Sequence, residues 1–479
     1  MVLRFLRGGH LEVAPVVMWF RRDLRVADNR ALARAASIAG EDGVAAIFAF
    51  SAQLMAKSSP QRVSYLLQAL RSLNLTMADR LNFSYGEPAR DVADFASSLE
   101  ASVVVATREF SPLGRQRDLR AKALLAERGI ALELGDSPYL IPPGKLLASS
   151  GDCYRVFTPF YKAVLAQGFG EPRVAPGVEF APRSRFDALA QEALLAPLRF
   201  DVSQFPASEE AARHRLVEFL SASAASYRVD RNDPSLEGTS RLSPALRFGV
   251  IHPREIAVAA GDFPGGDELL RQLVWRDFFA HVASSAPRGV WENFDARYDL
   301  LEFDDPSTAQ VRDRLDAWKE GATGYPIVDA GMRQLRNTGW MHNRVRMITA
   351  SFLVKDLHIH WRIGAKFFLE HLLDGDVASN NFSWQWVAGS GTDAAPYFRV
   401  FNPVLQSKRF DSTGNYIRRF VPELAHLSNR FIHEPWEAPS QGVLAATSYP
   451  ERVVRHDLER EEALRRYAQM KEAVAGSAS

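Results

Sequence analysis

The chain is organised around residues 361–403, and the densest part of this stretch reads DGDVASNNFSWQW at residues 374–386. It combines carboxylates, amides and indoles, a mixture too polar for a core helix and too aromatic for a solvated one. Asp374 and Asp376 are two residues apart, so on a helix they point in different directions, and the two indoles are spaced in the same way. Such pairs suit a segment that packs on a cofactor with one side and faces a partner with the other. A buried aromatic helix with Asp residues capping its start would give the same pattern.

The composition is that of an ordinary soluble protein. A length of 479 residues predicts two or three domains. The formal net charge is +1, so nucleic-acid binding would require a local basic patch. The single cysteine, Cys153, excludes an intrachain disulfide and a cysteine-based zinc site, and it fits a cytoplasmic location. Residues 1–15 lack the apolar core of a signal peptide, and no apolar run approaches the roughly 20 residues that span a bilayer.

Residues 15–135 alternate short apolar runs with helical segments. This alternation predicts an α/β domain with a doubly wound parallel sheet, whose ligand sites lie at the carboxyl ends of the strands. Neither a GxGxxG turn nor a Walker-type loop occurs there, so phosphate binding by those two devices is not supported. The expected strands are 16–20, 44–50, 103–106 and 130–134, and the expected helices are 31–39, 66–81, 89–99 and 115–128.

The second half of the chain has a different pattern. Prolines punctuate residues 136–206, which we expect to form a connector that packs on its neighbours. Residues 207–472 carry helical spacing without strand alternation, so we expect a large all-helical domain. Its expected helices are 211–220, 253–259, 267–283, 308–320, 327–338, 344–356 and 455–473.

Five motifs resemble the DNA photolyase/cryptochrome family and occur in that family's order. They are the segments 19–25, 238–244, 275–279, 324–330 and 340–347. The resemblance extends over nearly the whole chain and is closest to the class I cyclobutane pyrimidine dimer photolyases. It implies that the N-terminal sheet is an antenna domain and that the helical domain binds FAD. It also implies repair of pyrimidine dimers in DNA, in which excited reduced FAD donates an electron to the flipped-out dimer.

The resemblance also implies a set of FAD contacts. The hydroxyls and backbone N–H groups of residues 239–243 would hold the pyrophosphate, although an ordinary Ser/Thr helix cap would explain this segment too. Arg346 and Asp374 would form a buried ion pair beside the isoalloxazine. Asn380 would face flavin N5, where plant-type photoreceptors tend to carry an acid, so it favours repair. The full set is Tyr227, Thr239, Ser240, Arg241, Leu242, Ser243, Arg276, Asn343, Arg346, Asp374, Gly375, Asp376 and Asn380.

A chain of easily oxidised rings would keep the flavin reduced. Trp384 and Trp361 match the two inner tryptophans of the family's electron chain, while core packing is the alternative for any single tryptophan. The third position has Phe303 as its nearest counterpart, and phenylalanine is much harder to oxidise. Either another aromatic residue such as Tyr298 closes the route, or photoreduction is slow.

Substrate contacts follow from the same resemblance. Trp275 and Trp386 match the aromatic walls of the dimer pocket, and Asn343 and Met347 match residues that line the dimer. Six-four photoproduct enzymes carry histidines at those last two positions, so an amide and a thioether argue against six-four repair. Gln272 stands where class I enzymes usually carry glutamate, and it can hydrogen-bond but supplies neither an anion nor a proton. The residues expected in the photochemistry are Trp384, Trp361, Phe303, Asn380, Gln272 and Met347, and those expected to contact the DNA backbone are Arg231, Arg344, Arg399 and Gln406.

Further expectations concern partners and rival functions. Damaged DNA is the expected partner, without a membrane, and the protein is expected to be a monomer. A second chromophore, a deazaflavin or methenyltetrahydrofolate, is expected near residues 108–118. His358 and His360 diverge on a helix and lack ligand partners, so no metal site is expected. The rivals are a signalling photoreceptor of the same fold, a six-four photolyase, and a nucleic-acid-binding protein that keeps flavin only as structure.

Overall fold

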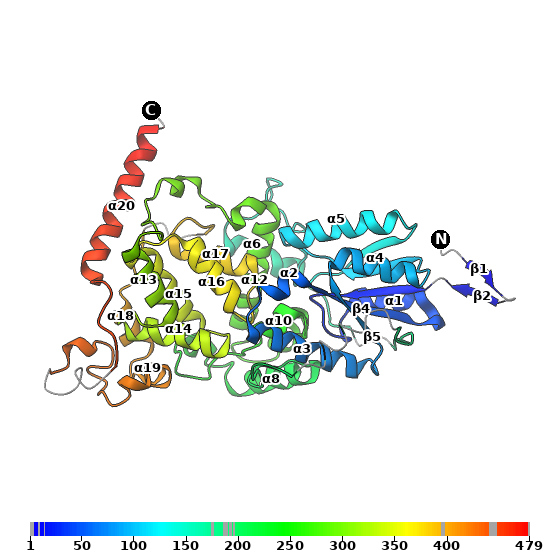
Figure 1. The fold of residues 1–479 in the computed structure, drawn as a ribbon, viewed down its shortest axis with the longest axis horizontal. Helices are drawn as coiled ribbons and strands as arrows, with labels where there is room; N and C mark the ends of the chain where they lie inside the picture. Colours follow the sequence, from blue (N-terminus) through cyan, green and yellow to red (C-terminus); the bar gives the residue numbers. More distant parts are fainter. Residues whose placement is uncertain are drawn as a thin grey trace. The chain divides into compact units, whose positions relative to one another are not determined.

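The structure is a computed structural model that describes residues 4–7, 10–13, 15–173, 177–184, 190, 194, 197–393, 398–439 and 448–477. The chain divides into two compact units, and its ribbon is drawn in Figure 1. Unit 1 consists of Met1–Ala225 and Ser240–Pro287, and unit 2 consists of Ser226–Thr239 and Arg288–Ser479. The expected fold class, a parallel α/β sheet followed by a helical body, is confirmed.

Unit 1 is built on a five-stranded parallel sheet with the strand order β5-β4-β3-β6-β7. Every residue of the central strand β3 is apolar and at most 1% exposed, as expected for a strand covered on both faces. Val16 of β3 pairs with Val44 on one side and with Val103 on the other. The strands are β3 (Val16–Phe20), β4 (Val44–Ser51), β5 (Leu81–Gly86), β6 (Val103–Thr107) and β7 (Ala131–Gly135), and a separate hairpin of β1 (Arg4–Arg7) and β2 (His10–Val13) precedes them.

The edge strand β5 corrects the sequence-based prediction. The pattern predicts a helix over 66–81 with no strand after it, whereas α3 (Pro60–Thr76) ends earlier and β5 begins at Leu81. Asn82 and Ser84 break the apolar pattern, yet each is only 2% exposed. The side chain of Asn82 donates to the Ala46 carbonyl oxygen at 2.9 Å, so this buried amide is hydrogen-bonded inside the sheet.

The helices of the sheet are α1 (Arg30–Ala39), α2 (Ala52–Ala56), α3, α4 (Pro88–Ser98) and α5 (Pro112–Ala126). Helices α3, α4 and α5 each begin with a proline behind a side-chain cap, which fixes where they start. Helices α4 and α5 pack against each other and cover the sheet face that carries Val17, Trp19 and Ile47 (Figure 1).

The remaining helices of unit 1 include one that the sequence pattern did not predict. The expected connector contains α6 (Phe157–Gln167), which packs on α12 (Gly266–Ser285) through aromatic contacts between Phe160 and Phe278. The other helices of this group are α8 (Glu209–Ala222), α10 (Ser243–Phe248) and α11 (Pro253–Gly261).

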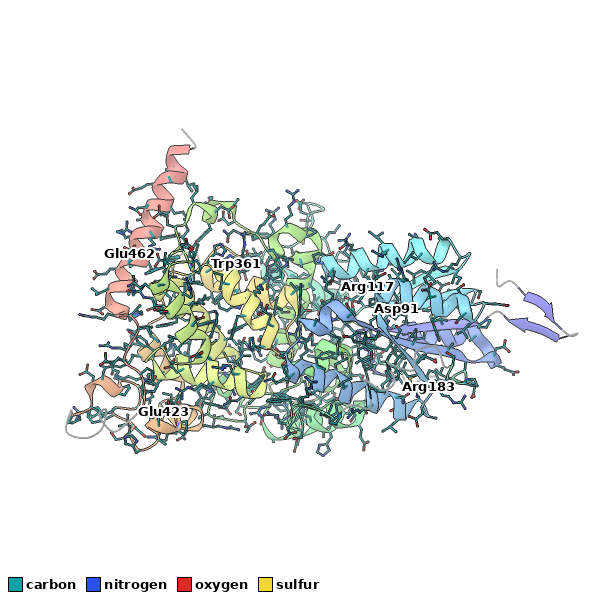
Figure 2. The ribbon with its side chains drawn as sticks, viewed as in Figure 1. Asp91, Arg117, Arg183, Trp361, Glu423 and Glu462 are labelled. Carbon is teal, nitrogen blue, oxygen red and sulfur yellow. The ribbon has the colours of Figure 1, made fainter. Side chains whose placement is uncertain are left out.

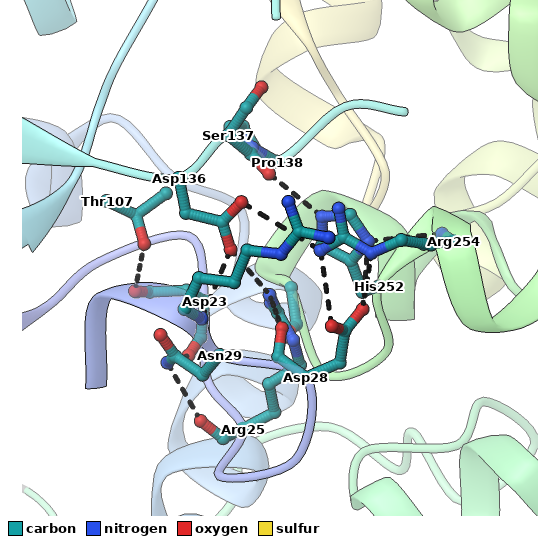
Figure 3. A network of polar contacts seen from close by, with 12 residues as sticks. Asp23, Arg25, Asp28, Asn29, Thr107, Asp136, Ser137, Pro138, His252 and Arg254 are labelled. Carbon is teal, nitrogen blue, oxygen red and sulfur yellow. Dashed lines mark hydrogen bonds and ion pairs between the residues drawn. The ribbon is translucent and has the colours of Figure 1, made fainter. Parts of the chain in front are cut away.

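A buried polar network ties α11 to the carboxyl end of β3 (Figure 3). Asp28 accepts two hydrogen bonds from Arg254, at 3.0 and 3.2 Å, while the neighbouring Asn29 caps α1. Burial, reinforced by Arg25 and Arg254, lowers the pKa of His252 well below its usual value. The neutral ring accepts a hydrogen bond from the Arg254 backbone N–H and bonds the Ser137 carbonyl oxygen. The network therefore joins segments that are far apart in the sequence.

The described part of unit 2 is helical, apart from its loops. Its α-helices are α9 (Tyr227–Asp230), α13 (Ala309–Glu320), α14 (Pro326–Thr338), α15 (Asn343–Ser351), α16 (Trp361–His371), α17 (Val377–Ala388), α18 (Pro403–Phe410), α19 (Asn415–Phe420) and α20 (His456–Ser477). The last turn of the expected helix 344–356 is a π-helical turn, η4 (Phe352–Asp356). The core of this unit packs α14, α15, α16 and α17 around Trp318, Trp361 and Trp384. Among the described residues, no helix has the length and apolarity that crossing a membrane requires.

Candidate functional site

The first face of interest lies on α15 in unit 2. Asn343, Arg346 and Met347 are spaced three and four residues apart, so they share one side of the helix. The Arg346 guanidinium donates from Nε to the Met341 carbonyl oxygen at 2.8 Å. It also donates from both terminal nitrogens to the Asp374 carboxylate, at 3.1 and 2.8 Å. The expected ion pair is confirmed, and its cation is held in one orientation while it remains 24% exposed.

The two carboxylates of the DGD sequence have different roles. Asp374 pairs with Arg346, whereas Asp376 caps α17 by accepting hydrogen bonds from the backbone N–H groups of Ala378 and Ser379, both at 3.1 Å. The divergence expected from their spacing is therefore confirmed. Gly375 is buried between them.

Asn380 lies one turn into α17, which packs on α15. Its side-chain nitrogen donates to the Ala365 carbonyl oxygen at 3.0 Å and to the Asn381 side-chain oxygen at 2.8 Å. Because both N–H groups have acceptors, the amide cannot flip without losing them. Its oxygen is the group that remains to accept a hydrogen bond from a ligand.

Trp318, Trp361 and Trp384 of unit 2 are deeply buried. The Trp384 ring makes edge contacts with Phe368 and with Trp318, whose ring centroids lie 5.0 and 6.2 Å away. Motif comparison did not single out Trp318, although it is fully buried. Trp361, labelled in Figure 2, donates its indole N–H to the Asn293 side chain at 2.8 Å.

Phe303, the nearest counterpart of the third tryptophan, is connected to Trp361 through the ring of His360. Phe303 contacts His360 at 4.7 Å between centroids, and His360 contacts Trp361 at 5.7 Å. Tyr298 lies instead beside Tyr467 of α20. The row of ring contacts from Phe303 to Trp361 therefore includes a histidine.

The segment of residues 239–243 has its last four members in unit 1. Within the described residues, no side chain caps the start of helix α10, so the expected alternative of an ordinary Ser/Thr cap is wrong. Arg241 has a φ of +53°, which is unusual for a residue with a side chain and costs about 1–3 kcal/mol. Arg215 donates to the Ser240 carbonyl oxygen at 3.1 Å. In unit 2, Tyr227 begins α9 and is 7% exposed.

Three expected site residues lie on α12 in unit 1. Trp275 stacks on Phe157 with a centroid separation of 3.7 Å and an interplanar angle of 2°. Gln272 donates from its side-chain nitrogen to a Glu268 oxygen at 2.8 Å. Arg276 donates to the Pro138 carbonyl oxygen at 2.8 Å and lies over the Tyr139 ring. Sequence reasoning missed the Phe157 stack, but the spacing of Glu268 one turn before Gln272 could have indicated their contact.

A cluster of cations lies in unit 2. Arg344 donates to the Asn232 side chain at 2.6 Å and sits 4.3 Å from the Phe410 ring centroid. Burial, together with the nearby charges of Arg231 and Arg409, lowers the pKa of Arg344 to about 10. Among the described residues, the buried Nε of Arg344 has no hydrogen-bond partner. An anionic partner would relieve this accumulation of positive charge. Arg399 is exposed, and Gln406 lies on α18.

The aromatic wall expected at Trp386 and the antenna segment 108–118 are also described. Trp386 is partly buried and donates its indole N–H to the Asp393 carbonyl oxygen at 3.0 Å.

In unit 1, Glu109 lies 3.4 Å from Arg117 and 3.9 Å from Arg22. Burial raises the pKa of Glu109, but these arginines outweigh burial and hold it below its usual value. Strand ends in this sheet thus carry buried ion pairs.

Comparisons with known proteins agree with these observations. Residues 16–177 match the family model described as DNA photolyase, and residues 269–469 match the model described as the FAD binding domain of DNA photolyase. The deoxyribodipyrimidine photo-lyases of Vibrio cholerae and Escherichia coli are each 38% identical over 477 residues, which cover 94% of this chain and 98% of the relative.

Solved structures show the same fold. A class III photolyase from Agrobacterium tumefaciens has a TM-score of 0.89 and 36% identity, covering 97% of this chain and 99% of that one. A cryptochrome from Synechocystis has a TM-score of 0.84 and 28% identity, covering 94% of this chain and 98% of that one. An archaeal photolyase from Sulfolobus tokodaii, described with two FAD molecules, has a TM-score of 0.82 and 30% identity, covering 95% of this chain and 100% of that one. The chain therefore belongs to the DNA photolyase family.

Proposed function

We propose that this protein is a deoxyribodipyrimidine photo-lyase, which uses bound FAD and blue light to reverse cyclobutane pyrimidine dimers in DNA. The observation that carries the proposal is the face of α15, where a fixed cation, Arg346, stands beside Asn343 and Met347. One helix face thus presents both a group suited to a flavin and groups suited to a pyrimidine. The relatives named deoxyribodipyrimidine photo-lyase, which match nearly the full chain, support the same conclusion.

The residues of unit 2 fit FAD. Arg346 is oriented by three hydrogen bonds and is still partly exposed, so it can face a ring that carries negative charge. Asn380 presents a fixed acceptor, which matches the N5–H that a reduced flavin has and an oxidised one lacks. When bound, reduced FAD supplies the electron that opens the cyclobutane ring under light. We assign Asp374, Gly375, Asp376, Asn343, Tyr227 and Thr239 to the same cofactor in unit 2.

In unit 1, we assign Ser240, Arg241, Leu242, Ser243 and Arg276 to cofactor binding. Hydroxyl groups and backbone N–H groups are the donors that a pyrophosphate requires. Arg241 supports this assignment because strained backbone positions concentrate at ligand sites. Arg276 donates to the carbonyl oxygens of Pro138 and Leu246, so it would support the cofactor site by holding the surrounding backbone.

The residues assigned to the substrate favour dimer repair over six-four repair. Asn343 and Met347 cannot act as general acids near neutral pH, which six-four chemistry would require of them. Gln272 can replace a carboxylate as an acceptor, because its N–H group is directed to Glu268 and this leaves its carbonyl oxygen for a pyrimidine N–H. Trp275 and Trp386 would supply aromatic faces for the flipped bases.

Electrons would reach the cofactor through Trp384 and Trp361. Their rings are buried among other aromatic side chains, which shields them from water. Phe303 and His360 continue the row of rings from Trp361, but both are harder to oxidise than tryptophan. We therefore expect slow photoreduction through this route.

DNA would bind through phosphate contacts from Arg231, Arg344, Arg399 and Gln406. Burial, together with the nearby Arg231 and Arg409, lowers the pKa of Arg344, and an approaching phosphate would stabilise these cations. Binding should weaken as salt increases.

We also propose that the protein is a cytoplasmic monomer, with residues 15–135 as the antenna domain, 136–206 as a connector and 207–472 as the FAD-binding domain. A second chromophore, deazaflavin or methenyltetrahydrofolate, would lie near residues 108–118.

The proposal is tested with two lesions in the same oligonucleotide sequence. The purified, reduced holoprotein is illuminated with a cyclobutane dimer substrate and with a six-four substrate, each with a dark control. We expect light-dependent repair of the dimer alone. Repair of the six-four lesion would reassign the substrate, and binding of neither lesion would favour a photoreceptor of the same fold.

A further inference from the structure

Lys355 is a buried cation to which the proposed repair mechanism gives no task. It lies on the π-helical turn η4, which extends α15, and it is only 3% exposed. Lysine is seldom so deeply buried, and π-helical turns occur often at functional positions. A side chain with this burial needs contacts that compensate for the lost water.

Its contacts lead to the segment of residues 398–401. The Lys355 ammonium donates a hydrogen bond to the carbonyl oxygen of Arg399 and lies 4.3 Å from the centroid of the Phe398 ring. Ser351, one turn earlier, accepts a hydrogen bond from the Phe401 backbone N–H at 3.4 Å. Ser351 and Lys355 therefore contact this segment at Phe398, Arg399 and Phe401.

In the described part of the chain, no carboxylate forms an ion pair with Lys355. Its neighbour Asp356 is fully buried and is bound by His456, while His358 pairs with Glu459. Burial lowers the pKa of Lys355 to about 7; Asp356 opposes this shift, and Arg399 adds to it. A cation in such surroundings costs stability, and ionisable groups with strongly shifted pKa values are concentrated at functional sites.

The cavity at this place is too small for a ligand. Its volume is about 20 Å³, which accommodates about one water molecule, and its lining includes Ser351, Lys355, Trp386, Phe398 and Phe401. The role of Lys355 is therefore exerted on the protein. The held segment carries the exposed Arg399 and continues into Asn402, which caps α18.

We propose that Lys355 is a positioning residue that fixes the backbone of residues 398–401 and so orients Arg399 toward a DNA phosphate. The proposal rests on the proposed function, because it deepens the DNA-binding site. Lys355 itself does not touch DNA in this arrangement.

The test compares Lys355→Met with Arg399→Ala in the full-length holoprotein, using a dimer-containing duplex over a series of salt concentrations. Lys319→Met is the control, since Lys319 is paired at the surface with Asp316 and its loss removes one positive charge without touching the segment. We expect Lys355→Met and Arg399→Ala each to weaken binding by about tenfold and to reduce the salt slope by about 1.

The double variant gives the decisive readout. If Lys355 acts through Arg399, then Lys355→Met combined with Arg399→Ala binds no more weakly than Arg399→Ala alone. Each variant should keep its bound FAD, measured by flavin absorbance, which separates positioning from a loss of fold. Additive losses, or an unchanged salt slope for Lys355→Met, would overturn the proposal.

Two further arms keep the outcome unambiguous. If Lys355→Met does not fold, Ser351→Ala removes the second anchor with little change in packing, and it should give the same partial loss and the same non-additivity with Arg399→Ala. Normal binding by Ser351→Ala in that case would count against the proposal. Failure of the unmodified protein to bind dimer DNA would instead refute the proposed function.

Discussion

Replacing Arg346 by methionine tests whether the ion pair on α15 exists for the cofactor or only for the fold. Arg346 makes three hydrogen bonds, and its loss leaves the Asp374 carboxylate, which is 7% exposed, without its cation. Breaking a fully buried pair costs about 3–5 kcal/mol, and the partial exposure of Arg346 reduces this to about 2 kcal/mol. The free energy of unfolding of the apoprotein, measured in urea, should fall by that amount.

Unit 2 offers a matched control in Arg333. Its Nε donates to the Gly321 carbonyl oxygen at 2.8 Å, and its terminal nitrogen lies 2.6 Å from Glu423, which is labelled in Figure 2. Its side chain is 22% exposed, close to the 24% of Arg346. Arg333→Met should therefore destabilise the apoprotein by a similar amount, about 1–2 kcal/mol, while leaving flavin binding intact.

Flavin titration of the two variants then separates the roles. Arg346→Met should bind FAD about tenfold more weakly than the unmodified protein, because a fixed, charged donor beside the ring is lost. Equal flavin affinities for Arg346→Met and Arg333→Met, at comparable losses of stability, would show that the pair is structural and would refute the reasoning.

Three other predictions follow from local geometry. Gln272→Glu should weaken dimer binding about threefold, because it places a second carboxylate one turn from Glu268. Adding Glu268→Gln should restore binding, and a filter-binding assay measures both affinities. Gly364→Ala would put a methyl group 2.2 Å from the Trp384 ring, so it should cost about 1–3 kcal/mol in urea unfolding and slow photoreduction measured by flavin absorbance. Burial raises the pKa of Asp277 from 3.8 to about 7, so the folded state binds the proton of this carboxyl group more tightly than the unfolded state does. The stability that this group contributes therefore falls as pH rises from about 4 to 7. Asp277→Asn should reduce this pH dependence of the free energy of unfolding, measured over the same range.

Much of the fold could be predicted because local patterns determine it. The apolar run of β3 reads as a strand covered on both faces, and it is one. The edge strand β5 escaped prediction because Asn82 and Ser84 interrupt its pattern, and only the folded sheet shows that both are buried. Helix α6 escaped because the prolines around it indicated an irregular connector.

The site divides in the same way. A buried arginine requires a carboxylate, so the pairing of Arg346 with Asp374 could be predicted from the residue types. The stack of Phe157 on Trp275 and the hydrogen bond from Lys355 to the Arg399 carbonyl oxygen could not be predicted, because each joins segments that only the tertiary fold brings together. The class I assignment stays a prediction, since a class III photolyase is 36% identical over nearly the whole chain.

The measurement that tests the central claim most directly is the recovery of pyrimidine absorbance in a dimer-containing oligonucleotide. The purified, reduced holoprotein is illuminated with blue light, and a dark sample serves as the control. Recovery under light, with none in the dark, is the predicted result. No recovery under light from protein that holds FAD and binds the oligonucleotide would contradict the assignment as a dimer photolyase.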